Sequence, residues 1–144
     1  MKLVAFLICD DIRTETGNKH SIIGVYDDII QFEVKEGQKN VWPKQMKLGV
    51  YARIIFEEND KAKNLDSIKF RLNYNGEIIN MGEGPFNSKE AFAANRMNFV
   101  FINPFFNFKG IGEMIFSIEF YDKKNNLIDA MGPEFKIKIT EKNI

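Results

Sequence analysis

Apolar and polar side chains alternate along much of the chain, and this period of two is typical of β-strands that bury one face. In 68–74, four apolar residues alternate with three polar ones, and in 48–56 an apolar residue stands at every second position. The pattern predicts strands over 3–12, 21–26, 29–34, 47–57, 68–74, 77–81, 96–102, 114–121, 127–131 and 135–139. The segment 105–109 between two of these strands is aromatic.

Turn residues separate the predicted strands. Gly17 and Asn18 favour a turn that joins the first two strands into a hairpin. Asn75-Gly76 is the strongest short hairpin signal in the chain. Asn103-Pro104 is expected to break the strand that precedes it. A helical turn over 91–95 is too short to count, so the sequence predicts no amphipathic helix.

This succession of about eight to ten short strands predicts an all-β fold. Because each strand must bury one face, the expected architecture is an antiparallel two-sheet β-sandwich, immunoglobulin-like or C2-like, and a closed barrel is the alternative. The 144 residues suit one domain that spans 1–144, and the 44% hydrophobic content is sufficient for a real core.

The charge balance and the apolar runs bear on partners. Twenty basic and twenty acidic residues give a formal charge of zero, which argues against generic nucleic-acid binding. No window approaches the roughly 18 apolar residues of a membrane span. The apolar run 3–9 is short and is followed at once by Asp10, so it predicts a buried strand and no signal peptide. With a single cysteine, Cys9, the chain suits a reducing compartment, and a cytoplasmic location is expected.

No arrangement of residues in the sequence is typical of an enzyme. Cys9 and His20, the only cysteine and the only histidine, are interpreted as a buried thiol and a solvated turn residue. The glycine pairs 82/84 and 110/112 lack the features of a phosphate-binding loop. The sequence therefore predicts a non-enzymatic protein without a cofactor.

Two pairs of carboxylates, Asp10-Asp11 and Asp27-Asp28, flank the first predicted hairpin. They are expected on the order of 15 Å apart at about 3.3 Å per residue, which argues against one shared calcium site. Each pair would need partners from elsewhere, such as Asp122 or 58–60. Calcium or carbohydrate binding is kept as the alternative function, and no metal ligand is assigned. Asp10, Asp11 and Arg13 are retained as a candidate polar recognition site.

Aromatic residues cluster around Asn103-Pro104, where the alternation fails. If some of these rings point outward, they would form an interface with a partner or a second copy. The alternative, which we favour, is that they pack beneath a loop at the end of the sandwich. The candidate interface residues are Phe99, Phe101, Phe105, Phe106 and Phe108, with Trp42 as a second, weaker candidate.

The first hairpin carries the string C-D-D-x-R-x-E-x-G-x-K-x-S-x-x-G-x-Y, from Cys9 to Tyr26. This string resembles the opening of a family of small uncharacterised proteins from bacteria and their phages that is classed as a domain of unknown function. The resemblance covers about eighteen residues closely. It implies a bacterial or phage origin and a cytoplasmic or virion-associated protein, and it brings no activity, cofactor or site residue. The sequence thus predicts a β-sandwich that acts by protein–protein interaction or self-association.

Overall fold

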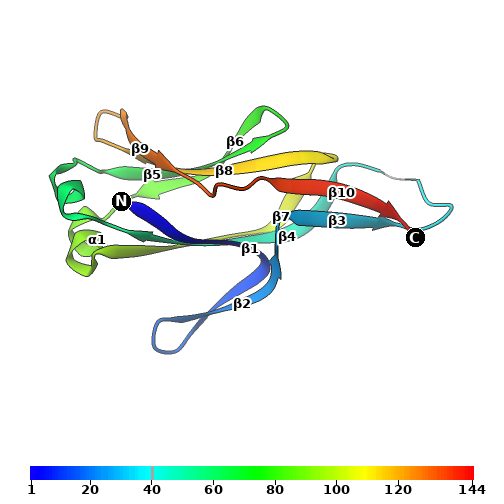
Figure 1. The fold of residues 1–144 in the computed structure, drawn as a ribbon, viewed down its shortest axis with the longest axis horizontal. Coiled ribbons are helices and arrows are strands. Elements are labelled where there is room, and N and C mark those ends of the chain that lie inside the picture. The colour runs from blue at the N-terminus through cyan, green and yellow to red at the C-terminus, as the bar shows by residue number, and fades with distance from the viewer. Residues whose placement is uncertain (40) are drawn as a thin grey trace.

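The computed structural model describes residues 1–39 and 41–144. The elements along the chain are β1 (Lys2–Glu15), β2 (Lys19–Tyr26), β3 (Ile29–Val34), β4 (Lys44–Ile55), the 3-10 helix η1 (Glu58–Ala62), β5 (Ser67–Tyr74), β6 (Glu77–Pro85), α1 (Ser88–Ala94), β7 (Arg96–Phe108), β8 (Gly112–Tyr121), β9 (Leu127–Met131) and β10 (Ile137–Asn143). Figure 1 shows that most of them lie in two layers, with α1 at one end and the paired β3 and β10 at the other.

The two layers are β-sheets packed face to face, which confirms the predicted all-β sandwich. Sheet A has the strand order β2-β1-β4-β7. Sheet B has the order β3-β10-β8-β5-β6, and β9 pairs with β8 beside β10. Neighbouring strands are antiparallel except for the parallel pair β3 and β10.

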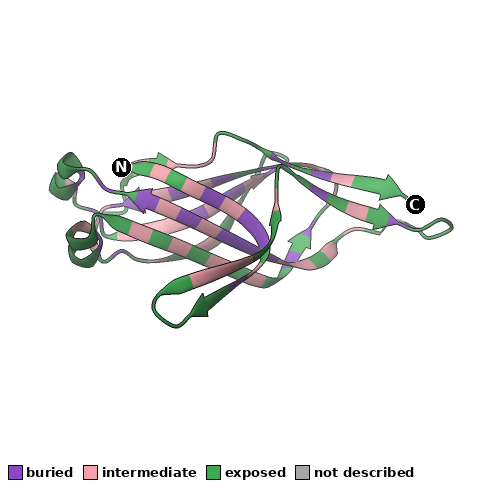
Figure 2. Cartoon of the chain, turned by 60° about the horizontal axis from the view of Figure 1, so that its bottom comes forward, coloured by how far each residue is buried: buried purple, intermediate pink, exposed green. Residues whose placement is uncertain are grey.

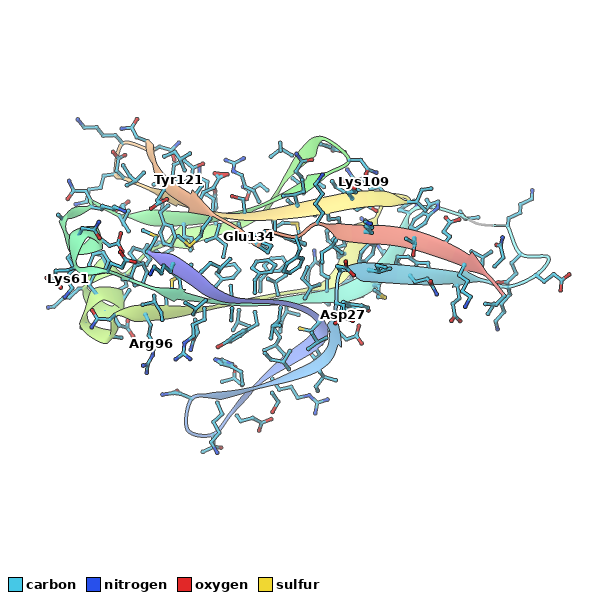
Figure 3. The ribbon with its side chains drawn as sticks, viewed as in Figure 1. Asp27, Lys61, Arg96, Lys109, Tyr121 and Glu134 are labelled. Carbon is cyan, nitrogen blue, oxygen red and sulfur yellow. The ribbon has the colours of Figure 1, made fainter. Side chains whose placement is uncertain are left out.

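The core lies between the sheets, where side chains fill the space (Figure 3). The period of two places one side of each strand there. In β4, Leu48, Val50, Ala52 and Ile54 are buried, and the predicted alternation therefore holds in this strand. Aromatic rings make many of the contacts, and Phe70 lies at their centre with its ring stacked on Phe116 at 5.5 Å.

β7 continues through Asn103-Pro104, so the prediction that this dipeptide breaks the strand is wrong. Leu48 pairs with Asn103 and Met46 pairs with Phe106, so two residues of β7 bulge opposite one residue of β4. β7 is an outer strand of sheet A, at the edge opposite β2, and one of its sides has no partner strand. Edge strands and bulges are the places where a sheet accepts proline.

A helix forms where none was predicted. Asn87 caps α1 by accepting a hydrogen bond from the backbone N–H of Glu90, and Asn95 ends it in the left-handed conformation (φ 56°). The ring of Phe92 packs on Phe56 at 5.4 Å. Seven residues form a helix here because capping and this tertiary contact supply what a short sequence pattern lacks.

The first hairpin bends out of sheet A. Residues 2–9 of β1 pair with β4, whereas residues 8–15 pair with β2. Figure 1 shows this β1–β2 hairpin folded back beneath the sandwich. Gly49 makes the bend possible, because a Cβ there would lie 2.9 Å from the sulfur of Cys9 and 3.5 Å from Cγ1 of Ile12. At the other end of β2, the ring of His20 packs on Tyr51 with centroids 5.8 Å apart.

In the part of the chain that the structure describes, no helix is long and apolar enough to cross a membrane.

Candidate interaction surface

The outer strands of the two sheets are β2 and β7 in sheet A, and β3, β6 and β9 in sheet B. An outer strand presents unpaired backbone groups, and proteins guard it with charged side chains, proline, bulges or bends. β2 belongs to the bent hairpin and begins with Lys19, and β3 is short and contains Glu33. β6 carries Glu77 and Glu83, and a register shift leaves Met81 without a partner in β5. β9 has five residues, includes Asp129 and pairs with β8 through a register shift. The side of β1 residues 2–7 that has no partner strand is interrupted by the register shift between Leu3 and Ala5. These edges are therefore protected.

β7 differs from them along its first half. Residues 96–103 pair with β4 without a register shift, and the bulge with Pro104 comes only after them. The twelve residues 97–108 form the longest stretch of the chain without Asp, Glu, Lys or Arg. Val100 and Ile102 point to the outer face of sheet A, where they are 37% and 38% exposed. Figure 2 shows this strand banded in exposed and half-buried positions, next to the largely buried β4. We call residues 97–102 the open edge.

The inward side chains of the open edge line a hollow between the two sheets. Phe99 and Phe101 are half-buried and lie edge-on to Phe70, at 5.0 and 5.1 Å. Together with Gly82 and Gly84 of β6, these rings border a groove of about 280 Å³. Two further hollows adjoin the same pair of strands, one toward α1 and one toward Phe105. No backbone pairing joins β6 to β7 among the described residues, so the sandwich is open along this side.

The structure distributes the predicted aromatic interface between core and surface. Phe106 and Phe108 are buried, with their rings 4.7 Å apart. Phe99 and Phe101 are inward and half-buried, and Phe105 alone is largely exposed, at 70%. The bulge explains this split, because it inserts one residue and turns Phe105 out of the inward series. Phe106 and Phe108 are therefore structural residues, and the accessible part of the predicted interface is Phe105 with the rims of Phe99 and Phe101.

Trp42 is held within the molecule. Its indole Nε1 donates a hydrogen bond to Glu141 at 2.6 Å, and its ring lies edge-on to Phe32 at 5.3 Å. The Lys44 ammonium lies 5.3 Å from the same ring. These contacts tie the segment before β4 to β3 and β10, and the structure does not place Trp42 beside the open edge.

The residues of the candidate polar site, Asp10, Asp11 and Arg13, make their contacts in two different places. Asp10 accepts a hydrogen bond from the hydroxyl of Tyr26 and covers Gly24 (φ +66°), where a Cβ would lie 2.2 Å from its carboxylate. Burial and the Asp10 carboxylate raise the pKa of Tyr26. Asp11 instead faces β4 and accepts a hydrogen bond from Lys47. The three residues therefore do not converge on one ligand position.

The Asp11 carboxylate joins the hairpin to sheet A. Its distance to Nζ of Lys47 is 2.6 Å and its distance to Nε of Arg13 is 3.6 Å. The hydrogen bond from Lys47 is the main reason why the pKa of Asp11 lies below its usual range. Asp11 thus anchors the bent hairpin to β4, whereas Asp10 bonds Tyr26 within the hairpin.

Cys9 and His20 do not meet. Cys9 is paired with Val25 and His20 with Thr14, five positions apart on the ladder. At about 3.3 Å per residue, five positions correspond to about 16 Å. Cys9 is fully buried, and this burial raises the pKa of its thiol. A buried protonated thiol is a poor nucleophile, so this pair forms no nucleophile and base.

The carboxylates weighed for calcium are engaged separately. Asp122 accepts backbone hydrogen bonds within its own turn, from Lys124 and Asn126. Asp60 is buried, and the Met1 amine and Nζ of Lys63 each lie 2.7 Å from its carboxylate. Burial would raise the pKa of Asp60, but these hydrogen bonds outweigh it and hold the pKa at about 2. Among residues 1–39 and 41–144, no three His, Cys, Asp or Glu side chains gather as metal ligands.

Sequence reasoning did not single out Val100 and Ile102, which define the outward face of the open edge. The sequence feature that could have identified them is the uncharged run 97–108, but only the aromatic residues of this run were considered. A comparison with protein-family models finds no match, and a comparison with curated proteins finds none either. The chemistry that the open edge offers is backbone hydrogen bonding to an added strand, with apolar side chains on both faces.

Proposed function

We propose that this protein is a non-enzymatic interaction or assembly module that binds a protein strand along its open edge. The observation that carries the proposal is the combination of a regular outer strand with the absence of charge and proline from 97–102. Strand addition of this kind takes its affinity from main-chain hydrogen bonds and its specificity from side chains at alternate positions.

The side chains of the open edge suit such a partner. Val100 and Ile102 offer apolar contacts on the outer face, and Phe99 and Phe101 offer aromatic contacts at the groove. Cross-strand pairs of aromatic and β-branched residues are among the more favourable pairs in sheets. A partner strand with apolar residues at alternate positions would therefore bury the exposed part of this edge.

The bacterial or phage origin and the cytoplasmic or virion-associated location belong to the same proposal. They rest on the resemblance of the string from Cys9 to Tyr26 and not on the open edge. The test of the function is independent of them.

The test is site-specific photo-crosslinking in cells that make the protein. A photoreactive phenylalanine analogue is placed at Val100, with a matched control at Ile115, which is 39% exposed on the outer face of sheet B. We expect a discrete crosslinked product from position 100 and none from position 115. The proposal is wrong if position 100 gives no product, or if both positions give the same products.

The complementary variant is Val100→Lys, with Ile115→Lys as its control. A lysine in an edge strand disfavours the addition of another strand. We expect Val100→Lys to weaken partner binding by about tenfold or more, while both variants, compared at low protein concentration and without partner, keep the unfolding free energy within about 0.5 kcal/mol of the wild type. Equal binding by the two variants would place the interaction elsewhere.

A further inference from the structure

We infer that the strand added at the open edge is β7 of a second copy, paired antiparallel about a two-fold axis at Val100. This inference rests on the proposed function and specifies its partner. The first reason is the symmetry of the uninterrupted segment. Asn95, in the left-handed conformation, precedes it, and the bulge at Pro104 follows it. A two-fold axis at Val100 aligns residues 97–103 with their own reverse and therefore pairs all of the regular segment except Arg96, which it places opposite Pro104 of the second copy.

The second reason is the identity of the residues that this register brings together. Directly opposite residues in an antiparallel pair share a face. With the axis at Val100, that residue faces its own copy, and Asn98 faces Ile102 on the outer side. On the inner side Phe99 faces Phe101. No charged side chain lies within 97–103, so the register opposes no like charges.

The third reason is the shape of the adjoining side. Gly82 and Gly84, which line the groove together with Glu83, add no side chains of their own at its mouth, and a Cβ at Gly82 would lie 3.8 Å from the ring of Phe101. In the paired arrangement, Phe99 and Phe101 of the second copy lie at this mouth. Their rings would cover the half-buried rings of the first copy and exclude water from the groove.

The fourth reason favours a second copy over an unrelated strand. A partner must offer a regular, uncharged edge of about seven residues. A second copy offers such an edge because it has the same β7. The other outer strands of the described chain are bent, bulged or charged, so each molecule has one such edge to pair. Pairing two of them forms an isologous contact that closes at a dimer. The formal charge of zero means that two copies approach without net repulsion.

Single-cysteine crosslinking tests both the dimer and its register. The native Cys9 is fully buried, so we expect it to contribute little crosslinking of its own. In the inferred dimer the two Val100 residues are directly opposite, within the Cα separation that a disulfide spans. Under mild oxidation we expect Val100→Cys to form a covalent dimer of twice 16.7 kDa, and the control Ile115→Cys to remain monomeric.

The register has its own measurement. An equimolar mixture of Asn98→Cys and Ile102→Cys is expected to give at least about tenfold more covalent dimer than either variant alone, because these positions face each other only across the two copies. Light scattering of the unmodified protein over a tenfold concentration range is expected to give the mass of a dimer. If substitution impairs folding, this measurement still decides the oligomeric state.

Monomeric mass at every concentration, with no excess crosslinking of Val100→Cys over Ile115→Cys, overturns the inference. A dimer that crosslinks through neither position 100 nor the 98/102 mixture overturns the register. A photo-crosslinked product at position 100 that contains a different protein overturns the second copy as partner but supports the proposed function. Absence of any product at position 100 removes both.

Discussion

The two edges of sheet A differ in the course of their outer strands. At one edge, the β1–β2 hairpin bends away over Gly49 and is anchored by Asp11 and Lys47. At the other, the open edge of β7 pairs with β4 without a register shift. Both edges expose β-branched residues, with Val25 at 50% on β2 and Val100 at 37% on β7. The comparison teaches that the course of the backbone, and not exposed apolar surface alone, decides whether an edge is open to another strand.

The largest expected effect tests the β7 edge of sheet A. Phe70→Ala removes the ring on which Phe99 and Phe101 rest, and truncation of a buried Phe costs about 3–5 kcal/mol. We expect a loss of this size in the free energy of unfolding, measured by urea denaturation at low protein concentration. The control is Phe105→Ala on the same side, because the Phe105 side chain is largely exposed. Truncation at such a surface position should change stability by less than about 0.5 kcal/mol. Equal losses would contradict the placement of these rings.

The next-largest effect tests the opposite edge, where the β1–β2 hairpin bends away from sheet A. Gly49→Val places a side chain against Cys9 and Ile12, and overpacking of this kind costs about 1–3 kcal/mol. We expect reduced stability and faster amide exchange in the hairpin, while the exchange of β7 stays unchanged. The control is Gly84→Val, because a Cβ at Gly84 meets no atom within 4 Å. The role given to Gly49 fails if both valines are tolerated equally.

The smallest effect tests how the ion pair between Asp11 and Lys47, which holds the hairpin, depends on pH. Because the pKa of Asp11 is lowered in the folded protein, its ion pair contributes stability above the pKa of the unfolded chain, and that contribution is lost as the pH falls through the folded pKa. We expect wild type to protect hairpin amides more than Lys47→Met near neutral pH, and the difference to disappear in acid. The measurement is hydrogen exchange of both proteins at each pH, with the amides of β7 as the internal reference. A difference that persists in acid would assign the protection to another contact.

The open edge was only partly predictable. The sequence singled out the aromatic cluster around Phe99 and Phe105, but it could not tell inward rings from outward ones across a bulge. Phe106 and Phe108 became core residues because the extra residue at Pro104–Phe105 shifts the alternation. The acidic residues Asp10 and Asp11 were also conspicuous, yet their partners Tyr26 and Lys47 follow from the bend of the hairpin.

The sequence by itself determined the local structure of this protein. The period of two marked the strands and their buried faces, and Asn75-Gly76 marked the β5–β6 hairpin, because both signals depend on neighbouring residues. Only the tertiary structure decided which strands are outermost, where the first hairpin leaves its sheet and which edge stays open. These features depend on pairing between segments far apart in the chain, such as β4 with β7 and β3 with β10, and periodicity specifies the face of a strand but not its neighbour.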